Sequence, residues 1–372
     1  MRGRRRILII GNYTADKLQS MERYANLLMQ IYKPVANVRL VKPTEIITRL
    51  PCLPSLLKKY LAYIDKLVFF PAWLLVISRH FDLIHIADHS NGFYSFCCPR
   101  GKCVVTCHDL LAVRGARGDK DSACTASVLG PFLQQLIMAG LRHSGRLLFV
   151  SETTRKDYHL LGGGPYFQRE TVIPNPLNAS FSSTVCDSSL SEEEIENIPD
   201  HPFLLMVGSS LPRKNRALAL RLIERLGSRS PYYLVFAGAS LSAEELAFKR
   251  TNPLGGRIIS IVRPSHALLN QLYCRAHALL FPSLSEGFGW PLIEAQACDC
   301  PVIASTTTSI PEVAGTGALY AQPHDVEVFY QHVCTLKNDT VREELIRCGR
   351  VNLKRFSRDK ITESYLKFAF ST

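Results

Sequence analysis

The stretch PSLSEGFGWPLIEAQACDCPVIAS, residues 282–305, carries the clearest structural signal in the chain. It follows an apolar run typical of a buried strand, and Gly287 and Gly289 form a flexible loop before a helix that opens on a proline. Such a helix start offers unpaired backbone N–H groups to an anionic diphosphate. Glu286 in the loop and Glu294 in the helix are carboxylates that accept hydrogen bonds from vicinal hydroxyls. The stretch therefore predicts a strand, a loop and a helix that bind a nucleotide sugar.

Outward from this stretch, short apolar runs alternate with helical patterns along the chain. Continuous apolar runs are expected of parallel strands that are buried on both faces. They lie at residues 6–10, 83–86, 103–106, 146–150, 203–207, 233–236, 258–262 and 278–281. Helical patterns separate them, for example at 216–226 and 268–276. This alternation predicts an α/β protein with doubly wound parallel sheets.

The chain has 372 residues, enough for two domains that each bury a core. The sequence VIPNP, residues 172–176, interrupts the alternation with two prolines that favour an extended connection. We therefore expect an N-terminal domain at 1–174 and a C-terminal domain that begins at 175.

Several motifs resemble, in the same order, those of retaining glycosyltransferases of family 4 (group 1), which have the GT-B fold. Glu286 and Glu294 match the E-x7-E pair of that family. Three further stretches agree with its histidine motif, its phosphate-binding segment and the segment after the acidic pair: VTCHDL at 105–110, VGSSLPRKN at 207–215 and SIPEVAG at 309–315. The resemblance covers most of the chain and looks most like mannosyltransferase-type members. It implies two Rossmann-like domains that face a central cleft, an acceptor domain at 1–174 and a nucleotide-sugar donor domain at 175–355. Residues 356–372 would form a C-terminal helix that crosses back to the N-terminal domain.

The resemblance also implies roles for residues of the C-terminal domain. Glu286 would bind hydroxyls of the transferred hexose, and Glu294 would bind the ribose of the donor. Arg213 and Lys214 would neutralise the diphosphate, which is a main catalytic contribution when no metal is present. Backbone N–H groups near the sugar or phosphate would come from Gly287, Phe288 and Gly289. The alternatives are a carboxylate favoured by the helix dipole for Glu294 and a solvated pair at a helix start for the two cations.

In the N-terminal domain, the resemblance implies that His108 faces the sugar from across the cleft and that Gly11 contacts the donor. His108 alternatively is a structural histidine in a turn with Asp109, and Gly11 alternatively closes a turn. The loop GNYTADKLQS, which begins at Gly11, has one glycine where many relatives have two or more. Asp299 stands where family members often have a glycine, which predicts a local change in the turn after the helix.

The excess positive charge lies in the N-terminal half. Residues 1–175 contain 24 Lys and Arg against 12 Asp and Glu, whereas the remainder contains 20 of each. This asymmetry indicates an anionic partner, and no nucleic-acid-binding motif is present, so that nucleic acid is not expected. Residues 54–78, PSLLKKYLAYIDKLVFFPAWLLVIS, read as a basic amphipathic helix, interrupted at Pro71, of the kind that lies in a membrane interface. An ordinary surface helix followed by a buried segment is the alternative.

No export signal or membrane-spanning helix is expected, because the apolar run near the N-terminus is short and no run of about 20 apolar residues is evident. This predicts a cytoplasmic protein, at most peripheral on the inner face of a membrane. The twelve cysteines lack zinc-finger spacing and are interpreted as free thiols. The cysteines therefore predict no metal site, and the resemblance implies a transferase that needs neither a metal nor a cofactor.

The expected reaction moves a hexose from a nucleotide diphosphate sugar, of the GDP-mannose or UDP-glucose type, to a glycan or lipid-linked acceptor in polysaccharide biosynthesis. A metal-dependent transferase of another fold is the first alternative, because Asp119-Lys120-Asp121 reads D-x-D, although within a charged loop. A nicotinamide-dependent enzyme is the second, without a G-x-G-x-x-G motif in its favour. A non-catalytic sugar-nucleotide-binding protein is the third, and it would be expected to have lost the charges of the diphosphate site.

Overall fold

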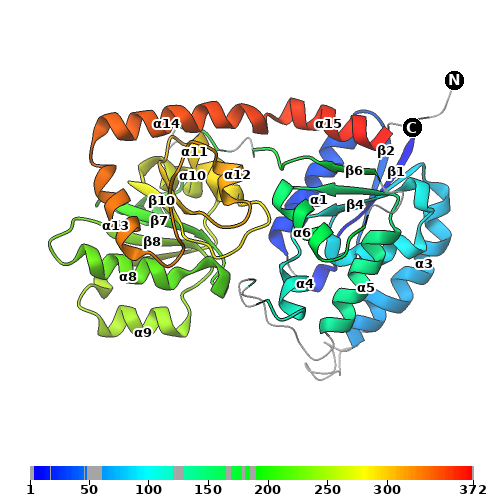
Figure 1. The fold of residues 1–372 in the computed structure, drawn as a ribbon, viewed down its shortest axis with the longest axis horizontal. Coiled ribbons are helices and arrows are strands. Elements are labelled where there is room, and N and C mark those ends of the chain that lie inside the picture. Colours follow the sequence, from blue (N-terminus) through cyan, green and yellow to red (C-terminus); the bar gives the residue numbers. More distant parts are fainter. Residues whose placement is uncertain are drawn as a thin grey trace. The chain divides into compact units, whose positions relative to one another are not determined.

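The computed structural model describes residues 4–16, 18–45, 47, 61–119, 122, 130–164, 169–177, 181–184 and 190–370. They divide into two compact units. The first comprises Met1–Arg117, Ala126–Pro174 and Ile361–Thr372, and most of the second is Asn175–Lys360. Each unit is built on its own six-stranded sheet, and helices cover both faces of each sheet (Figure 1).

The sheet of the first unit has the strand order β2-β1-β3-β4-β5-β6, and all neighbouring strands are parallel. The strands are β1 (Arg6–Ile10), β2 (Asn37–Val41), β3 (Leu83–Ile86), β4 (Cys103–Cys107), β5 (Arg146–Phe149) and β6 (Arg169–Val172). Every residue of β3 and β4 is buried. Central strands of a parallel sheet are covered on both sides, which is why their sequences are continuous apolar runs.

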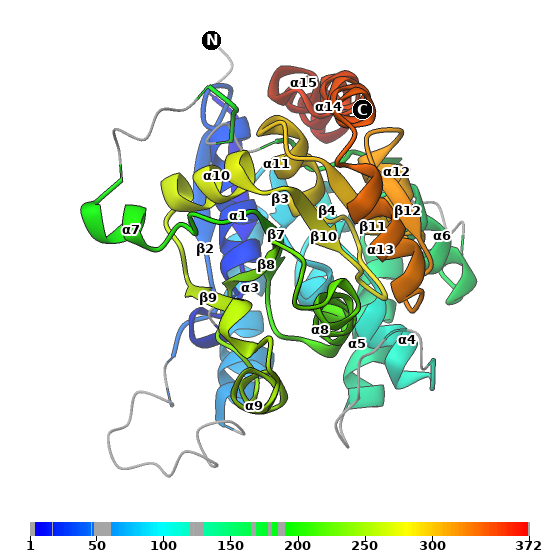
Figure 2. The same cartoon turned by 90° about the vertical axis from the view of Figure 1, so that its left-hand side faces the viewer.

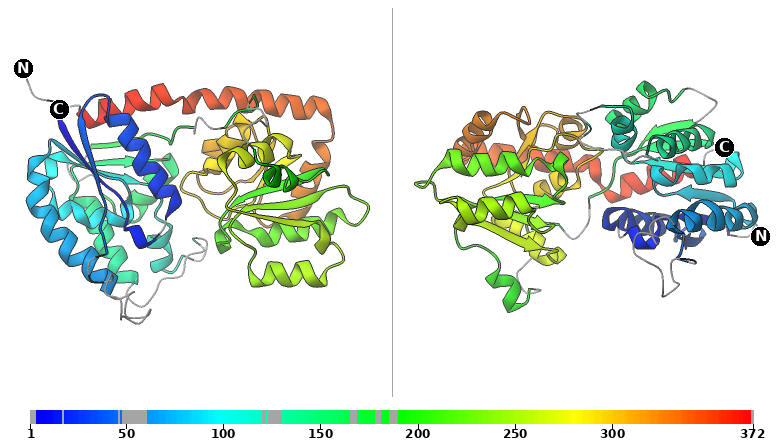
Figure 3. Two further views of the ribbon diagram at one scale, coloured as in Figure 1. Left: turned by 180° about the vertical axis from the view of Figure 1, so that it is seen from behind. Right: turned by 90° about the horizontal axis from the view of Figure 1, so that it is seen from below.

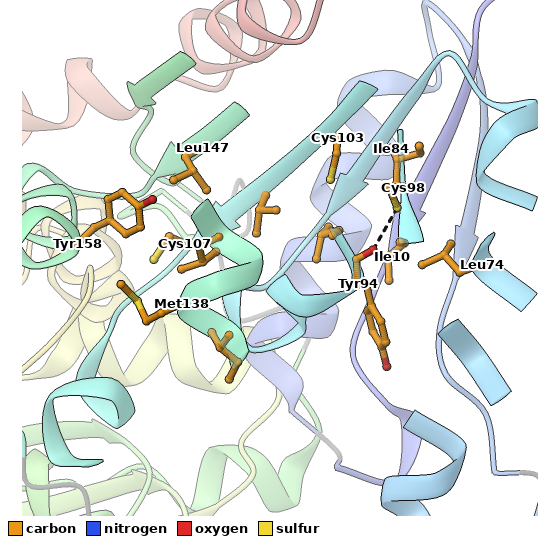
Figure 4. Packing of buried hydrophobic residues seen from close by; sticks show 14 of the residues in the cluster. Ile10, Leu74, Ile84, Tyr94, Cys98, Cys103, Cys107, Met138, Leu147 and Tyr158 are labelled. Carbon is orange, nitrogen blue, oxygen red and sulfur yellow. Dashed lines mark hydrogen bonds between the residues drawn. The ribbon is translucent and has the colours of Figure 1, made fainter. Parts of the chain in front are cut away.

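One face of this sheet packs against α3 (Phe70–Ile77), the 3-10 segment η4 (His89–Cys97) and α5 (Gly130–His143). Leu74, Tyr94 and Met138 enter the core from these elements (Figure 4). Cys98, Cys103 and Cys107 also lie in this core as free, buried thiols. The Cys98 thiol donates to the carbonyl oxygen of Tyr94 over 3.3 Å, drawn as a dashed line in Figure 4. These cysteines therefore pack as small apolar groups. The unit also contains α4 (Leu111–Ala116) and α6 (Glu152–Leu160).

The other face carries α1 (Gln19–Tyr32), the blue helix in front of the sheet in the left panel of Figure 3, and the terminal helix α15 (Arg358–Phe370). A buried chain of hydrogen bonds joins both helices to the sheet. The hydroxyl of Tyr365 lies 2.6 Å from that of Tyr24, which lies 2.9 Å from Thr106 Oγ1. His85 continues the chain, with Nε2 2.8 Å from Thr106 and Nδ1 2.9 Å from the Tyr32 hydroxyl. Burial lowers the pKa of His85 to about 3, so that its ring is neutral. This series of hydrogen bonds holds α15 against the sheet of the first unit.

The sheet of the second unit has the order β12-β11-β10-β7-β8-β9, again with all neighbours parallel. The strands are β7 (Phe203–Gly208), β8 (Tyr233–Gly238), β9 (Ile258–Val262), β10 (Ala278–Phe281), β11 (Val302–Ser305) and β12 (Leu319–Ala321). On one side lie α8 (Arg216–Leu226) and α9 (Ala243–Thr251), and on the other α10 (His266–Arg275) and α11 (Trp290–Ala297), as Figures 1 and 2 show. The described residues of the unit also include α7 (Glu192–Glu196), α12 (Ile310–Ala314), α13 (Val326–Thr335) and α14 (Asp339–Leu353).

All eight predicted strands are present, with ends that differ by at most two residues. The prediction missed β2, β6, β11 and β12. Three of these strands are at the edges of their sheets, where one side of the strand is unpaired and polar residues are tolerated. β11 is buried throughout, but with four residues, VIAS, it is too short to show a period of its own.

The segment at 54–78 differs from expectation. Residues 54–60 lie outside the described part of the chain, and the remainder belongs to a helical run, Leu61–His80. The run continues through Pro71 because the preceding turn, η2 (Asp65–Phe69), is π-helical, with the Phe70 N–H bonded to the Asp65 carbonyl. This wider turn accommodates the proline ring. The run has a mean hydropathy of 1.7 and only 22% of its apolar window is buried, so that it is long and apolar enough to cross a membrane. The expectation that no such stretch exists is therefore wrong on length and composition, which a helix of a water-soluble protein can also satisfy.

Candidate active site

The candidate site of the second unit forms where β7 and β10 end. These neighbouring strands are the place where the strand order reverses, and open α/β sheets bind ligands outside the carboxyl ends of the strands at this switch point. The segment after β7 and the loop after β10 are joined by the Leu284 N–H, which donates to the Arg213 carbonyl over 2.7 Å. Asn215 has a left-handed backbone, with φ of 55°, and its side-chain amide donates to the Pro282 carbonyl over 3.0 Å. The two loops therefore form one rigid base.

Three charged residues meet on this base. Glu286 is 7% exposed, and its two carboxylate oxygens accept from Arg213 Nη1 over 2.5 Å and from Lys214 Nζ over 2.6 Å. Burial alone would raise the pKa of Glu286, but the two cations outweigh it and lower that pKa. Burial likewise lowers the pKa of Lys214, against the attraction of Glu286. Two cations against one carboxylate leave the cluster with a positive charge, which suits a diphosphate.

Residues of the segment after β11 form hydrogen bonds with the loop that carries Glu286. The Glu286 N–H donates to Thr308 Oγ1 over 2.9 Å, and the Ser309 hydroxyl donates to the carbonyls of Glu286 and Phe288 over 2.9 and 3.2 Å. Gly289 is the N-cap that directly precedes α11; its φ is 98°, and a Cβ there would lie 3.0 Å from the Leu292 side chain. Among the described residues, the N–H groups of Phe288 and Gly289 meet no acceptor. They are the donors that a helix start offers to an anion.

Glu294 lies on α11, and a buried tyrosine is one of its partners. It is 2% exposed and accepts from the Tyr273 hydroxyl over 3.1 Å. Glu294 lies beyond the first turn of α11, which contains no acidic residue. The helix dipole stabilises carboxylates mainly within that turn, so that it does not account for Glu294. Burial raises the pKa of Tyr273 well above its ordinary value, and the hydroxyl therefore stays protonated as a donor to Glu294.

The two candidate residues of the first unit follow β1 and β4. His108 is 7% exposed, and its Nε2 lies 2.9 Å from the Ala87 carbonyl, so that Nε2 carries the proton. Burial lowers its pKa despite nearby Asp88, which leaves a neutral ring with Nδ1 as an acceptor. The N–H of Gly11 donates to the Val41 carbonyl over 2.8 Å. Gly11 therefore has no amide hydrogen left for a phosphate, as the alternative interpretation of a turn residue implies.

Sequence reasoning overlooked three polar residues beside His108. Asn12 follows β1, and Asp88 and His89 follow β3. Asn12 Nδ2 lies 2.5 Å from Asp88 Oδ2, and His89 Nδ1 lies 3.0 Å from Asp88 Oδ1. The available signal was their position directly after apolar strands, since such positions gather at one edge of a parallel sheet.

The D-x-D pattern is only partly visible, because Lys120 and Asp121 lie outside the described residues. Within the described ranges, no group of three or more His, Cys, Asp or Glu is arranged to hold a metal ion.

Asp299, after α11, has a left-handed backbone with φ of 55°. Glycine adopts this conformation without strain, whereas a side chain rarely does. Here the Asp299 carboxylate accepts two hydrogen bonds from Arg350, over 2.7 and 2.6 Å. The left-handed turn is thus present with an aspartate in place of glycine, and the ion pair with Arg350 stabilises it.

Two doubly wound sheets, the second with a cationic cluster and a helix start at its switch point, define the GT-B fold of glycosyltransferases. Solved structures share this architecture over the full chain. Sucrose-phosphate synthase from Thermosynechococcus elongatus aligns with a TM-score of 0.75 at 20% identity over 98% of both chains. WaaG, a glycosyltransferase involved in lipopolysaccharide biosynthesis, aligns with a TM-score of 0.72 at 14% identity over 99% of this chain and 100% of its own.

Residues 189–351 match the family model of glycosyl transferases group 1, so that the second unit carries a domain of this family. The chain is 32% identical over 165 residues to O-antigen chain mannosyltransferase B of Escherichia coli, a match that covers 43% of each protein. It is 32% identical over 159 residues to O-antigen chain mannosyltransferase RfbU of Salmonella typhimurium, covering 42% of this chain and 41% of that protein. The alignments thus span less than half the length of these relatives.

Proposed function

We propose that this protein is a retaining hexosyltransferase that uses a nucleotide diphosphate hexose without a metal ion. The observation that carries the proposal is the cluster of Arg213, Lys214 and Glu286 at the switch point of the second sheet. Its positive charge and the unpaired N–H groups of Phe288 and Gly289 are complementary to a sugar diphosphate.

In the proposed reaction, an acceptor hydroxyl attacks the anomeric carbon from the face on which the diphosphate leaves. A bond forms between the acceptor oxygen and the anomeric carbon, and the bond from that carbon to the diphosphate oxygen breaks. The diphosphate oxygen takes the hydroxyl proton, so that no carboxylate is needed as a nucleophile. Arg213 and Lys214 stabilise the charge that develops on the leaving group. Glu286 keeps free lone pairs and holds hydroxyls of the hexose.

GDP-mannose is the donor we favour. The two relatives at 32% identity are named as mannosyltransferases. UDP-glucose is the second candidate, because a GT-B neighbour at 16% identity, Anabaena Alr3699/HepE, was crystallised with it. The His108 ring, with Nδ1 as a hydrogen-bond acceptor, is assigned to a hydroxyl of the same sugar.

The test is to incubate purified protein in EDTA with UDP-, GDP- and ADP-hexoses and to follow nucleotide release by mass spectrometry. Slow release of GDP from GDP-mannose is the expected result, and NMR of a transferred product should show the anomeric configuration of the donor. Activity that appears only with manganese would overturn metal independence. No release under either condition, together with an unchanged melting temperature in GDP and UDP, would overturn the donor site.

We further propose that the acceptor is lipid-linked or membrane-proximal, because the first unit has a surface suited to an acidic membrane. The exposed side of η2 and α3 consists of apolar residues that are 38–67% exposed: Val68, Phe69, Trp73, Leu75 and Val76. The Arg39 guanidinium lies 5.8 Å from the centre of the Trp73 ring, and all of the excess charge of the chain, +12, lies in residues 1–175. An apolar helix face combined with basic charge is the pattern of interfacial helices.

Flotation with vesicles of phosphatidylglycerol and phosphatidylcholine tests this surface. Leu75→Glu with Val76→Glu should abolish binding, because both side chains are exposed and their replacement inserts charge into the apolar face. Val351→Glu, an exposed valine of α14 in the second unit, is the matched control and should leave binding unchanged. Equal flotation of all variants would overturn the membrane surface.

A further inference from the structure

Both sheets are doubly wound and each has a switch point, which points to a second ligand site. In the second sheet the order reverses between β7 and β10, where the charge cluster lies. In the first sheet it reverses between β1 and β3. The residues that follow these two strands therefore occupy the place where an open α/β sheet binds its ligand.

A cluster of polar side chains fills this place in the first unit. Asn12, two residues after β1, donates through Nδ2 to Asp88, two residues after β3. Asp88 is 3% exposed and also accepts from the backbone N–H and the hydroxyl of Ser90, over 3.0 and 2.6 Å. Its carboxylate is thus largely saturated. Asp88 holds its neighbours in position and has little capacity left for a ligand.

Three polar side chains of this cluster keep hydrogen-bonding capacity. Asn12 is 7% exposed, and its Oδ1 has no partner although its amide belongs to the cluster. A buried acceptor without a partner is costly, and a hydroxyl of a ligand would satisfy it. His89 Nε2 lies 3.9 Å from Asp109 Oδ1, too far for a hydrogen bond. The imidazole and the carboxylate therefore lie next to each other without a hydrogen bond between them. A hydroxyl group of a ligand placed between them accepts a hydrogen bond from the imidazole N–H and donates one to the carboxylate.

The charge of the cluster indicates the class of ligand. Burial alone would lower the pKa of His89, but Asp88 and Asp109 outweigh it and raise that pKa above its ordinary value. With the ring protonated or neutral, one imidazole between two carboxylates leaves a negative sum, opposite to the cluster of the second unit. Such a site repels phosphate and favours a neutral polyhydroxyl group. Among the described residues, this cluster also does not qualify as a metal site.

We propose that Asn12, His89 and Asp109 bind the sugar hydroxyls of a glycan acceptor, and that Asp88 is the residue that positions them. The proposal rests on the proposed transferase function and adds to it the chemistry of the acceptor: the end that receives the hexose is a neutral sugar, without a phosphate at the reacting ring.

Two conservative variants test the site. Asp109→Asn keeps the Oδ1 that accepts from the Leu111 N–H and removes the charge. His89→Gln removes the imidazole from a side chain that is 12% exposed. Glu152→Gln is the control, because this carboxylate follows β5 at the same edge of the sheet and forms an exposed ion pair with Arg155.

The first measurement is saturation-transfer NMR of methyl α-D-mannoside, methyl α-D-glucoside and mannose 6-phosphate with the full chain and no donor. Either neutral glycoside should give a signal that both site variants lose and the control keeps, and mannose 6-phosphate should give a weaker one. The second is the acceptor KM of the neutral glycoside in the transfer reaction, which should rise by roughly 10- to 100-fold in each site variant. Donor hydrolysis without acceptor should change less than the acceptor KM, since the diphosphate-binding cluster lies in the second unit and neither variant alters His108, the residue of the first unit assigned to the donor sugar. Thermal melting establishes that each variant is folded.

The outcomes separate the two proposals. Unchanged glycoside binding and acceptor KM in both folded variants would overturn the acceptor site while donor hydrolysis upholds the transferase. Glycoside binding that the variants lose, without hydrolysis of any nucleotide sugar, would overturn the transferase and uphold the sugar site. Preference for mannose 6-phosphate over both neutral glycosides would overturn the assignment of a neutral acceptor.

Discussion

Replacement of Lys214 by methionine tests the central electrostatic argument most directly. Lys214 is largely buried, its ammonium group lies 5.0 Å from the centre of the Phe281 ring, and its Nζ donates to Glu286. Methionine keeps the length of the side chain against the ring and removes only the charge. The cluster then contains one cation and one carboxylate, and its positive charge falls to zero.

The size of the effect follows from this change in charge. A unit charge about 4 Å from a leaving phosphate contributes on the order of 4 kcal/mol at an effective dielectric constant near 20. Removal of one preorganised donor from a developing oxyanion costs about 2.7–4 kcal/mol elsewhere, or about 10²–10³ in kcat. We therefore expect Lys214→Met to lower kcat by about 100- to 1000-fold. The loss of stability should stay within about 1.5–3 kcal/mol, the contribution of a charged hydrogen bond, because Arg213 still pairs with Glu286.

The assay is the initial rate of transfer at saturating donor, together with urea unfolding of the same preparations. Lys337→Met is the matched control, since Lys337 also lies over an aromatic ring of the second unit, that of Tyr232, at 5.9 Å. The control should retain full kcat. A kcat for Lys214→Met within threefold of wild type would refute the reasoning, because the ammonium group would then have no share in the departure of the diphosphate.

Three other predictions follow from the packing and the ionisation states. Tyr24→Phe and Tyr365→Phe should each lower the free energy of unfolding by about 1–3 kcal/mol, since each leaves a buried partner unsatisfied. Urea titrations of the single and double variants should show a coupling energy of at least about 0.5 kcal/mol between the two sites. Strict additivity of the two losses would contradict the series of hydrogen bonds. Asp299→Gly should change the free energy of unfolding by no more than about 1 kcal/mol and leave activity intact. Glycine relieves the strain of the left-handed backbone, and this gain offsets the loss of a largely exposed ion pair with Arg350. A loss of activity would show that this turn is functional. Burial lowers the pKa of His108 below its ordinary value of 6.5, so that the ring stays neutral and kcat should not fall as the pH drops through 6.5. A loss of activity with a midpoint at or above pH 6.5 that disappears in His108→Gln would contradict a neutral ring.

The candidate site was only partly readable from the sequence. The residues Arg213, Lys214 and Glu286 were identified, but with separate roles for the cations and the carboxylate. The structure instead joins them in one ion cluster, because the loops after β7 and β10 are adjacent in space and 72–73 residues apart in the chain. Asn12, Asp88 and His89 were missed for a similar reason, since they form no motif and gain meaning only where two strands end side by side.

The sequence by itself determined the secondary structure of the central strands and the division into two sheets. A parallel strand that is buried on both faces must be a continuous apolar run, and such a run is visible without knowledge of its neighbours. It also determined the loop and helix around Glu286, because glycines, a proline and an acidic residue restrict the local backbone by themselves.

Only the tertiary structure decided which of these local features act together. The order of strands places the switch points, and strand order depends on contacts between residues distant in the chain. The passage of a helix through Pro71 required a π-helical turn at Asp65–Phe69 that no local preference predicts. The attachment of α15 depends on Tyr365 meeting Tyr24, 341 residues earlier. Charge, burial and hydrogen bonding are properties of such distant pairs, and for this reason the ionisation states of His85, His89 and His108 could be inferred only from the folded chain.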